Sequence, residues 1–150
     1  NRNIYGRYFE DVADGEMLDP MTKVISLAKM TGYGVATSDF VRIHYDRDYA
    51  REMGFGEPVV DGQMFGAFLV QMVQNWAGPW GRLLKLSFQN RIMVYAGESV
   101  ICCGKVIKRY RSGGQNLIEF SLWITNQSGQ TVVREASATV HLPLKLSETP

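Results

Sequence analysis

The sequence contains few of the residues that mark disulfide-rich, metal-binding or redox proteins. Of its 150 residues only two are cysteine and two are histidine. Cys102 and Cys103 are adjacent in an alternating apolar stretch, so their side chains should point to opposite faces of a strand and should not pair. No metal-ligand spacing and no glycine-rich dinucleotide loop is present, so we expect neither a metal nor a cofactor.

Long apolar runs and an excess of one charge are also missing. The longest apolar stretch, residues 64–76, is too short to span a bilayer and is interrupted by glutamine and asparagine. No run near the first residue resembles a signal peptide. The formal net charge is +1, which gives no overall field for nucleic acid or a membrane surface. We therefore expect no nucleic-acid partner, no membrane partner and a cytoplasmic location.

One local basic cluster stands out against this balanced charge. It consists of Lys105, Lys108, Arg109 and Arg111, directly before Ser112-Gly113-Gly114. The glycines favour a solvated hairpin end. A binding site for the phosphates of a ligand is the alternative.

The second half of the chain predicts one buried helix followed by strands. Between Gln63 and Trp76 apolar residues cover more than one helical stripe, which is typical of a buried helix. Later apolar residues alternate with period two, and residues 126–129 have the composition of a hairpin turn. The sets expected to share a face are Leu84, Leu86 and Phe88; Val100, Cys102, Gly104 and Val106; and Ile118, Phe120, Leu122 and Ile124. With a last strand at 132–142, the class is α+β: an antiparallel sheet wrapped around a long central helix, in one domain spanning 1–150.

The first half predicts shorter elements. Pro20 to Ile25 has the character of a short strand, and Ser26 stands where a helix N-cap is expected. The helix that follows should run from Leu27 to near Thr37. Asp46 can cap a second short helix over residues 47–52, and two glycines and a proline predict a loop after it.

Asp39 and His44 are the strongest candidates for chemistry. On a regular helix they would lie about 140° apart, so they meet only if the chain turns between them. A carboxylate and an imidazole that converge on one water can add it to, or remove it from, an activated double bond. A structural role for His44 is the alternative.

Gly62 is the second candidate, because it opens the predicted central helix. The first amides of a helix have no partner within it, and the helix dipole places partial positive charge there. A carbonyl oxygen that gains negative charge would be stabilised at this end. Asp61 has the right side chain for the N-cap, and both roles can hold together.

Three segments together resemble the MaoC-like, R-specific enoyl-CoA hydratases. The run from Asp39 through His44 to Ala50 resembles the family signature Ser-Gly-Asp-x-Asn-Pro-Ile-His followed by five residues and Ala. Residues 54–62 resemble the loop that usually ends in His-Gly before the central helix. Residues 95–100 resemble the Tyr-Pro-Gly-Asp-x-Leu entry to a strand. The order and spacing of these segments match over nearly the whole chain.

The resemblance implies a fold and an activity. The fold is the hot dog, usually a dimer with the active site near the subunit interface. Asp39 and His44 would hold the catalytic water, and the Gly62 amide would bind the thioester carbonyl. Water would add reversibly to the α,β double bond of an enoyl thioester carried by coenzyme A or an acyl-carrier protein. A homodimer or higher homo-oligomer is expected, with coenzyme A present only as part of the substrate.

Four positions depart from the family pattern. They are Ser38 for glycine, Val41 for asparagine, Arg42 for proline and Asp61 for histidine. Val41, Arg42 and Asp61 are therefore candidate substrate-binding residues, at which the substrate specificity could differ from that of the family. Arginine binds carboxylates in a two-pronged contact, so Arg42 suggests a carboxylated or polar acyl group. The alternative is that Arg42 points to solvent or pairs with Asp46 or Asp48.

Two other functions are open on the same fold. One is an acyl-CoA thioesterase, which would release free thiol from a saturated acyl-CoA. The other is a non-catalytic or half-competent subunit of a hetero-oligomeric hydratase, which the replacements at Val41 and Asp61 keep open.

Overall fold

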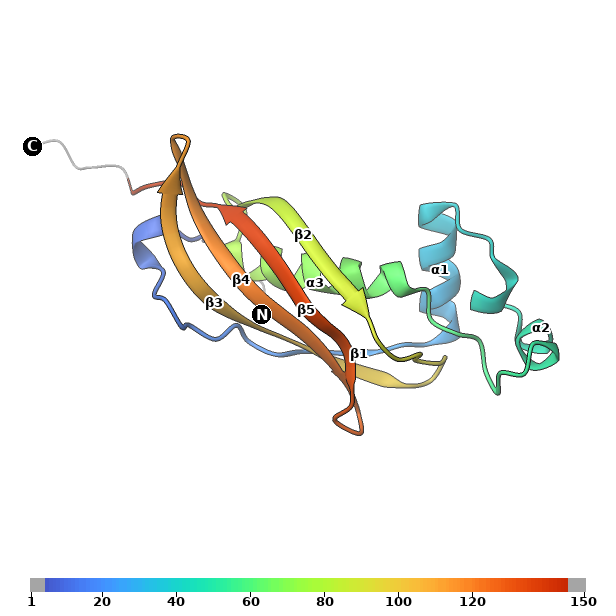
Figure 1. Ribbon diagram of the computed structural model, residues 1–150. Helices are drawn as coiled ribbons and strands as arrows, with labels where there is room; N and C mark the ends of the chain where they lie inside the picture. Colours follow the sequence, from blue (N-terminus) through green and yellow to red (C-terminus); the bar gives the residue numbers. More distant parts are fainter. Residues whose placement is uncertain (1–4, 146–150) are drawn as a thin grey trace, which may run out of the picture.

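A curled antiparallel sheet lies over one long helix in the computed structural model, which describes residues 5–145 (Figure 1). The strand order is β1-β3-β4-β5-β2, and every neighbouring pair is antiparallel. The strands are β1 (Met21–Val24), β2 (Arg82–Asn90), β3 (Ser99–Ser112), β4 (Gln115–Asn126) and β5 (Thr131–His141). The helices are α1 (Leu27–Thr37), α2 (Arg47–Glu52) and α3 (Gly62–Ala77), with 3-10 turns η1 (Phe9–Asp11) and η2 (Arg42–His44). This confirms the α+β class and the central helix.

α3 is the helix that the sheet encloses. Asp61 is its N-cap, and the Asp61 carboxylate accepts a hydrogen bond from the backbone N–H of Gln63 at 2.8 Å. The prediction of a helix buried nearly all round is right for most of its surface. One stripe is exposed, because polar or small residues recur there at helical spacing: Gln63, Ala67, Gln71 and Gln74.

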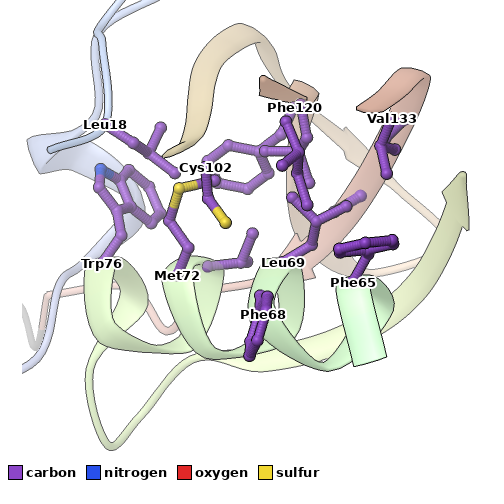
Figure 2. Packing of buried hydrophobic residues seen from close by; sticks show 14 of the residues in the cluster. Leu18, Phe65, Phe68, Leu69, Met72, Trp76, Cys102, Phe120 and Val133 are labelled. Atoms are coloured by element: carbon purple, nitrogen blue, oxygen red, sulfur yellow. The ribbon is translucent and has the colours of Figure 1, made fainter. Parts of the chain in front are cut away.

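The core lies between α3 and the concave face of the sheet. Figure 2 shows Phe65, Leu69 and Met72 pointing from α3 toward the strands. Trp76 meets Phe120 of β4 edge to face, with ring centroids 4.9 Å apart. Burial of each such side chain contributes about 1.5–3 kcal/mol to folding. The core therefore holds α3 in a defined position, and with it the start of α3 near the site described below.

The strand predictions hold in β3 and β4 and fail in part in β2. The predicted inward sets of β3 and β4 are all buried. In β2, Leu84 is 39% exposed, whereas Leu83 packs against the core. The pairing with β5 shifts register between Leu83 and Lys85, and such a bulge reverses the alternation of faces. Leu84 therefore does not share a face with Leu86 and Phe88.

Both cysteines are free, and they lie on opposite faces of β3. Cys102 is buried and Cys103 is half-buried. Burial raises the pKa of Cys102 to about 12, so its thiol stays protonated at neutral pH.

The basic cluster lies near the β3–β4 hairpin, and much of it is engaged within the chain. Lys108 pairs with Glu119 at 3.2 Å, and the Arg109 guanidinium lies over the Phe9 ring. The solvated hairpin end is thus the arrangement observed. Among residues 5–145, no helix has the length and hydropathy needed to cross a membrane.

The segment from α1 to α2 is separate from the sheet. Figure 1 shows α1 and α2 beyond one end of the sheet, with α1 beside the first turn of α3 and α2 farther from it. Ser26 caps α1 by accepting from the Lys29 N–H at 3.3 Å, and Asp46 caps α2 by accepting from the Tyr49 N–H at 3.0 Å. Both predicted caps are confirmed.

Candidate active site

Asp39 is placed by the way α1 ends. Ser38, directly after the helix, adopts the left-handed conformation with φ 60°, which turns the chain back on itself. The Asp39 N–H then donates to the Gly34 carbonyl at 2.9 Å. A Cβ on Gly34 would lie 2.6 Å from the Asp39 carbonyl oxygen, so only glycine permits this approach. The Asp39 Oδ1 atom accepts from the Val41 N–H at 3.1 Å, which orients the carboxylate.

His44 is held by the segment that precedes α3. Its Nδ1 atom lies 2.7 Å from the Val59 carbonyl oxygen, and the Val59 N–H donates to the Ile43 carbonyl at 3.0 Å. A carbonyl oxygen can only accept, so Nδ1 carries the hydrogen. In the neutral ring, the lone pair is therefore on Nε2.

Asp61 is the third polar side chain at this place. One nitrogen of His44 and one carboxylate oxygen each from Asp39 and Asp61 all lie within 4.8 Å of one another. The three side chains are half-buried. The turn that Asp39 and His44 required is provided by the end of α1 together with η2. Sequence spacing alone did not predict that Asp61 joins them.

An apolar cavity of about 230 Å³ opens beside these three side chains. It lies between α1, η2 and the start of α3. Its walls are formed by Met30, Thr31, Tyr33, Gly34, Val35, Phe40, Tyr45 and Met64, in addition to Asp39, His44 and Asp61. None of these lining residues is a lysine or an arginine. The cavity therefore suits an uncharged, mostly apolar group that reaches the carboxylates and the imidazole.

Tyr33 is a polar residue of the cavity wall that we did not single out from the sequence. It lies on α1, three residues after Met30, and both side chains line the cavity. Burial, and then the negative charges of Asp61 and Asp39, raise the pKa of the Tyr33 hydroxyl. The hydroxyl therefore stays protonated and is a hydrogen-bond donor at neutral pH. A tyrosine on the helix turn before Asp39 was the signal that could have identified it.

Gly62 is the first residue of α3, as expected. Its amide has no acceptor within the helix and donates to no other residue between 5 and 145. A Cβ on Gly62 would collide with the side-chain amide of Asn90, so this position needs glycine for packing as well. Gly62 itself is not among the residues that line the cavity.

Arg42 and Val41 are placed away from the cavity. The Arg42 guanidinium donates to Asp46 from Nε at 3.0 Å and from Nη2 at 2.7 Å, and it lies over the Tyr49 ring. This is the alternative in which Arg42 pairs with an acid. The Val41 side chain is 55% exposed. Neither residue is among those that line the cavity.

A curled sheet around one helix, with a carboxylate and an imidazole beside the helix start, defines a hot-dog protein of the hydratase and dehydratase class. The sequence profile described as MaoC like domain matches residues 9–111, well over half of the chain. The chain therefore belongs to the MaoC-like dehydratase family.

Individual relatives are more distant in sequence than in structure. The mitochondrial 3-hydroxyacyl-[acyl-carrier-protein] dehydratase of Arabidopsis thaliana is 23% identical over 122 residues, covering 81% of this chain and 73% of that protein. R-hydratase PhaJ1 from Pseudomonas aeruginosa has a TM-score of 0.86 at 20% identity, covering 98% of this chain and 96% of that one. The ChsH1-ChsH2 complex from Mycobacterium tuberculosis contains a chain with a TM-score of 0.76 at 23% identity, covering 87% of this chain and 98% of that one. These structural matches establish the hot-dog fold.

Proposed function

We propose that this protein adds water reversibly to the α,β double bond of an enoyl thioester. The observation that carries the proposal is the convergence of Asp39 and His44 at the mouth of an apolar cavity. The names of the relatives above, a dehydratase and an R-hydratase, are consistent with this chemistry.

The two side chains can handle one water between them. The Nε2 lone pair of His44 and the remaining oxygen of Asp39 are acceptors, so a water can donate one hydrogen to each. As the water oxygen attacks Cβ, one acceptor takes a proton from it. Cα receives a proton from the protonated member of the pair, and dehydration reverses these steps.

The start of α3 provides a place for the negative charge that develops on the thioester oxygen. Within residues 5–145 the Gly62 amide donates to no acceptor, and the helix dipole adds partial positive charge at this end. Gly62 directly follows Asp61, which lines the cavity together with His44 and Asp39, so a thioester carbonyl bound at this amide would lie beside that pair. Loss of an oxyanion donor costs about 10²–10³ in rate in other enzymes.

The cavity favours an apolar acyl group. Its wall contains methionine, valine and aromatic side chains, no lysine or arginine between residues 5 and 145 lines it, and Arg42 is already paired with Asp46. These observations favour an uncharged acyl group over the carboxylated one that Arg42 suggested. We propose an uncharged enoyl group, carried as a coenzyme A thioester, with no separate cofactor.

The test is hydration of a short enoyl-CoA by the purified protein, followed as loss of the enoyl ultraviolet absorbance. Asp39→Asn keeps an oxygen for the Val41 N–H but removes the charge. We expect Asp39→Asn and His44→Ala each to lower kcat/KM at least about 100-fold, with unchanged circular dichroism.

Matched controls come from the same chain. Asp48→Asn removes a carboxylate whose side chain is 94% exposed, and His141→Ala removes the only other histidine. Both should retain full activity. Full turnover in Asp39→Asn or His44→Ala would contradict the proposed function.

A second candidate is a subunit that works with a partner chain. Val35 and Phe40 line the cavity and yet are 63% and 62% exposed, as expected if another chain covers them. We propose a homodimer, with the hetero-oligomer as the competing assembly. Light scattering on the purified protein would separate a monomer from a dimer, and an inactive monomer would favour the hetero-oligomer.

A further inference from the structure

The three polar side chains of the site present only acceptors to one another. One oxygen of Asp39 accepts from the Val41 N–H, and one oxygen of Asp61 accepts from the Gln63 N–H. His44 uses its Nδ1 hydrogen on the Val59 carbonyl. Each side chain is therefore oriented by a backbone group and keeps an acceptor that these bonds do not use, which is Nε2 in His44 and the second oxygen in each carboxylate.

One water does not bridge all three side chains. Water has two hydrogens, so it can donate to two of the three acceptors, and because the side chains are half-buried the third acceptor is left to another water. A cation accepts all three lone pairs at once. The backbone bonds to His44 and to both carboxylates are the supporting interactions that orient ligands in metal sites.

The charge around the three side chains also favours a cation. Between residues 5 and 145, neither Asp39 nor Asp61 forms an ion pair with a lysine or an arginine. After burial, the charges of these two carboxylates are the causes that raise the pKa of Tyr33. Two negative charges thus act on the cavity without a positive side chain to balance them.

We propose that Asp39, His44 and Asp61 form a binding site for a divalent first-row transition-metal ion such as Zn²⁺. One imidazole nitrogen and two carboxylate oxygens form a donor set that zinc accepts, with a fourth position left open. Ligand atoms of a tetrahedral zinc site lie roughly 3.3 Å apart, given bonds of about 2.0–2.2 Å. The present separations are at most 4.8 Å, so small side-chain rotations would close the site. Mg²⁺, which prefers oxygen ligands, should bind more weakly.

The proposed ion would occupy the same lone pairs that the hydration reaction needs. Zinc should therefore inhibit hydration reversibly, and a chelator should restore the activity. The binding part of this inference is independent of the proposed function, since it requires only the geometry of the three side chains. The inhibition part rests on the proposed function.

Zinc binding is measured by isothermal titration calorimetry on the chelator-treated protein. Asp61→Asn is the most informative variant, because asparagine still caps α3 while losing a charged ligand. We expect one zinc per chain, and an affinity at least about 10-fold lower in Asp61→Asn, Asp39→Asn and His44→Ala. Asp48→Asn and His141→Ala are the matched controls and should bind like the unmodified chain.

Three results would overturn the inference. The first is no saturable zinc binding below about 1 mM. The second is binding that all three ligand variants retain, which would indicate a site elsewhere on the surface. The third is zinc that binds at this site without slowing hydration. This result would show that the ion does not occupy the lone pairs that the hydration reaction needs. Zinc binding by a protein inactive on every enoyl thioester would instead refute the proposed function and leave the metal site intact.

Discussion

The sheet with α3 and the segment from α1 to α2 are built in different ways. In the sheet, β3, β4 and β5 are joined by long ladders with a few register shifts, and α3 buries most of its surface against the sheet. In the α1–α2 segment, Met30 and Ala50 are the only buried residues of the two helices. The site residues there are half-buried and held by single hydrogen bonds.

Because of this difference, the sheet with α3 should determine the stability of the protein, and the α1–α2 segment should determine its chemistry. Burial of large apolar side chains dominates the free energy of unfolding, so damage to the core should affect the whole molecule. Damage to the α1–α2 segment should displace Asp39 or His44 while the fold persists. Loops and connections positioned by a rigid scaffold are common places for functional groups.

The largest expected effect is from Phe65→Ala in α3. Phe65 is 2% exposed, and its removal leaves a cavity under the sheet. We expect the free energy of unfolding to fall by about 3–5 kcal/mol, measured by urea denaturation. Gln74→Ala, on the exposed stripe of the same helix, should change it by less than about 0.5 kcal/mol. Similar losses in the two variants would contradict the assignment of the buried face.

The next effect is from Gly34→Ala in α1. The new Cβ would push against the Asp39 carbonyl, which lies 2.6 Å from its position, and backbone cannot yield as a flexible side chain does. Misplacing a catalytic group by about 1 Å can cost 100-fold in rate, so we expect kcat/KM for hydration to fall about 10- to 100-fold.

Gly32→Ala is the matched control in the same helix. A Cβ at Gly32 has open space around it, and alanine is the better helix former by about 1 kcal/mol. This variant should be slightly more stable and fully active. Equal activity of the two alanine variants would show that Gly34 does not position Asp39.

A smaller effect is expected from Ser38→Gly. Ser38 has φ 60°, a conformation that costs a residue with a Cβ about 1–2 kcal/mol but costs glycine little. Glycine gains some freedom in the unfolded chain, so we expect a net stabilisation of about 0.5–1 kcal/mol. Urea denaturation measures it. A loss of stability would mean that the Ser38 side chain contributes a contact of its own.

The smallest effect on catalysis is expected from Arg42→Ala. Arg42 pairs with Asp46 outside the cavity, so its removal should change kcat/KM for an uncharged enoyl-CoA by about twofold or less. The same comparison on a carboxylated enoyl-CoA is the critical measurement. A selective loss on the carboxylated substrate would restore Arg42 as a substrate-binding residue.

Much of the fold could be predicted because local patterns agree with it. The caps Ser26, Asp46 and Asp61 were recognisable by residue type, and each is observed. Alternation predicted the inward faces of β3 and β4. It failed at Leu84, because a bulge inserts one residue against β5 and no local signal in β2 marks it.

The candidate site could be predicted only in part. The spacing of Asp39 and His44 required a turn, and the resemblance to MaoC-like hydratases suggested their chemistry. The convergence of Asp61 with this pair and the place of Tyr33 in the cavity wall depend on contacts between α1, η2 and the start of α3. No periodic pattern encodes such contacts.

By itself, the sequence determined the helices, most of the strand faces and the caps, because these follow from the burial and backbone bonding of neighbouring residues. The tertiary structure alone decided which polar groups share one small space. The hydrogen bond from His44 to the Val59 carbonyl brings together segments of the chain that local rules treat separately. Together with the turn after α1, it places two carboxylates and an imidazole in the wall of one apolar cavity.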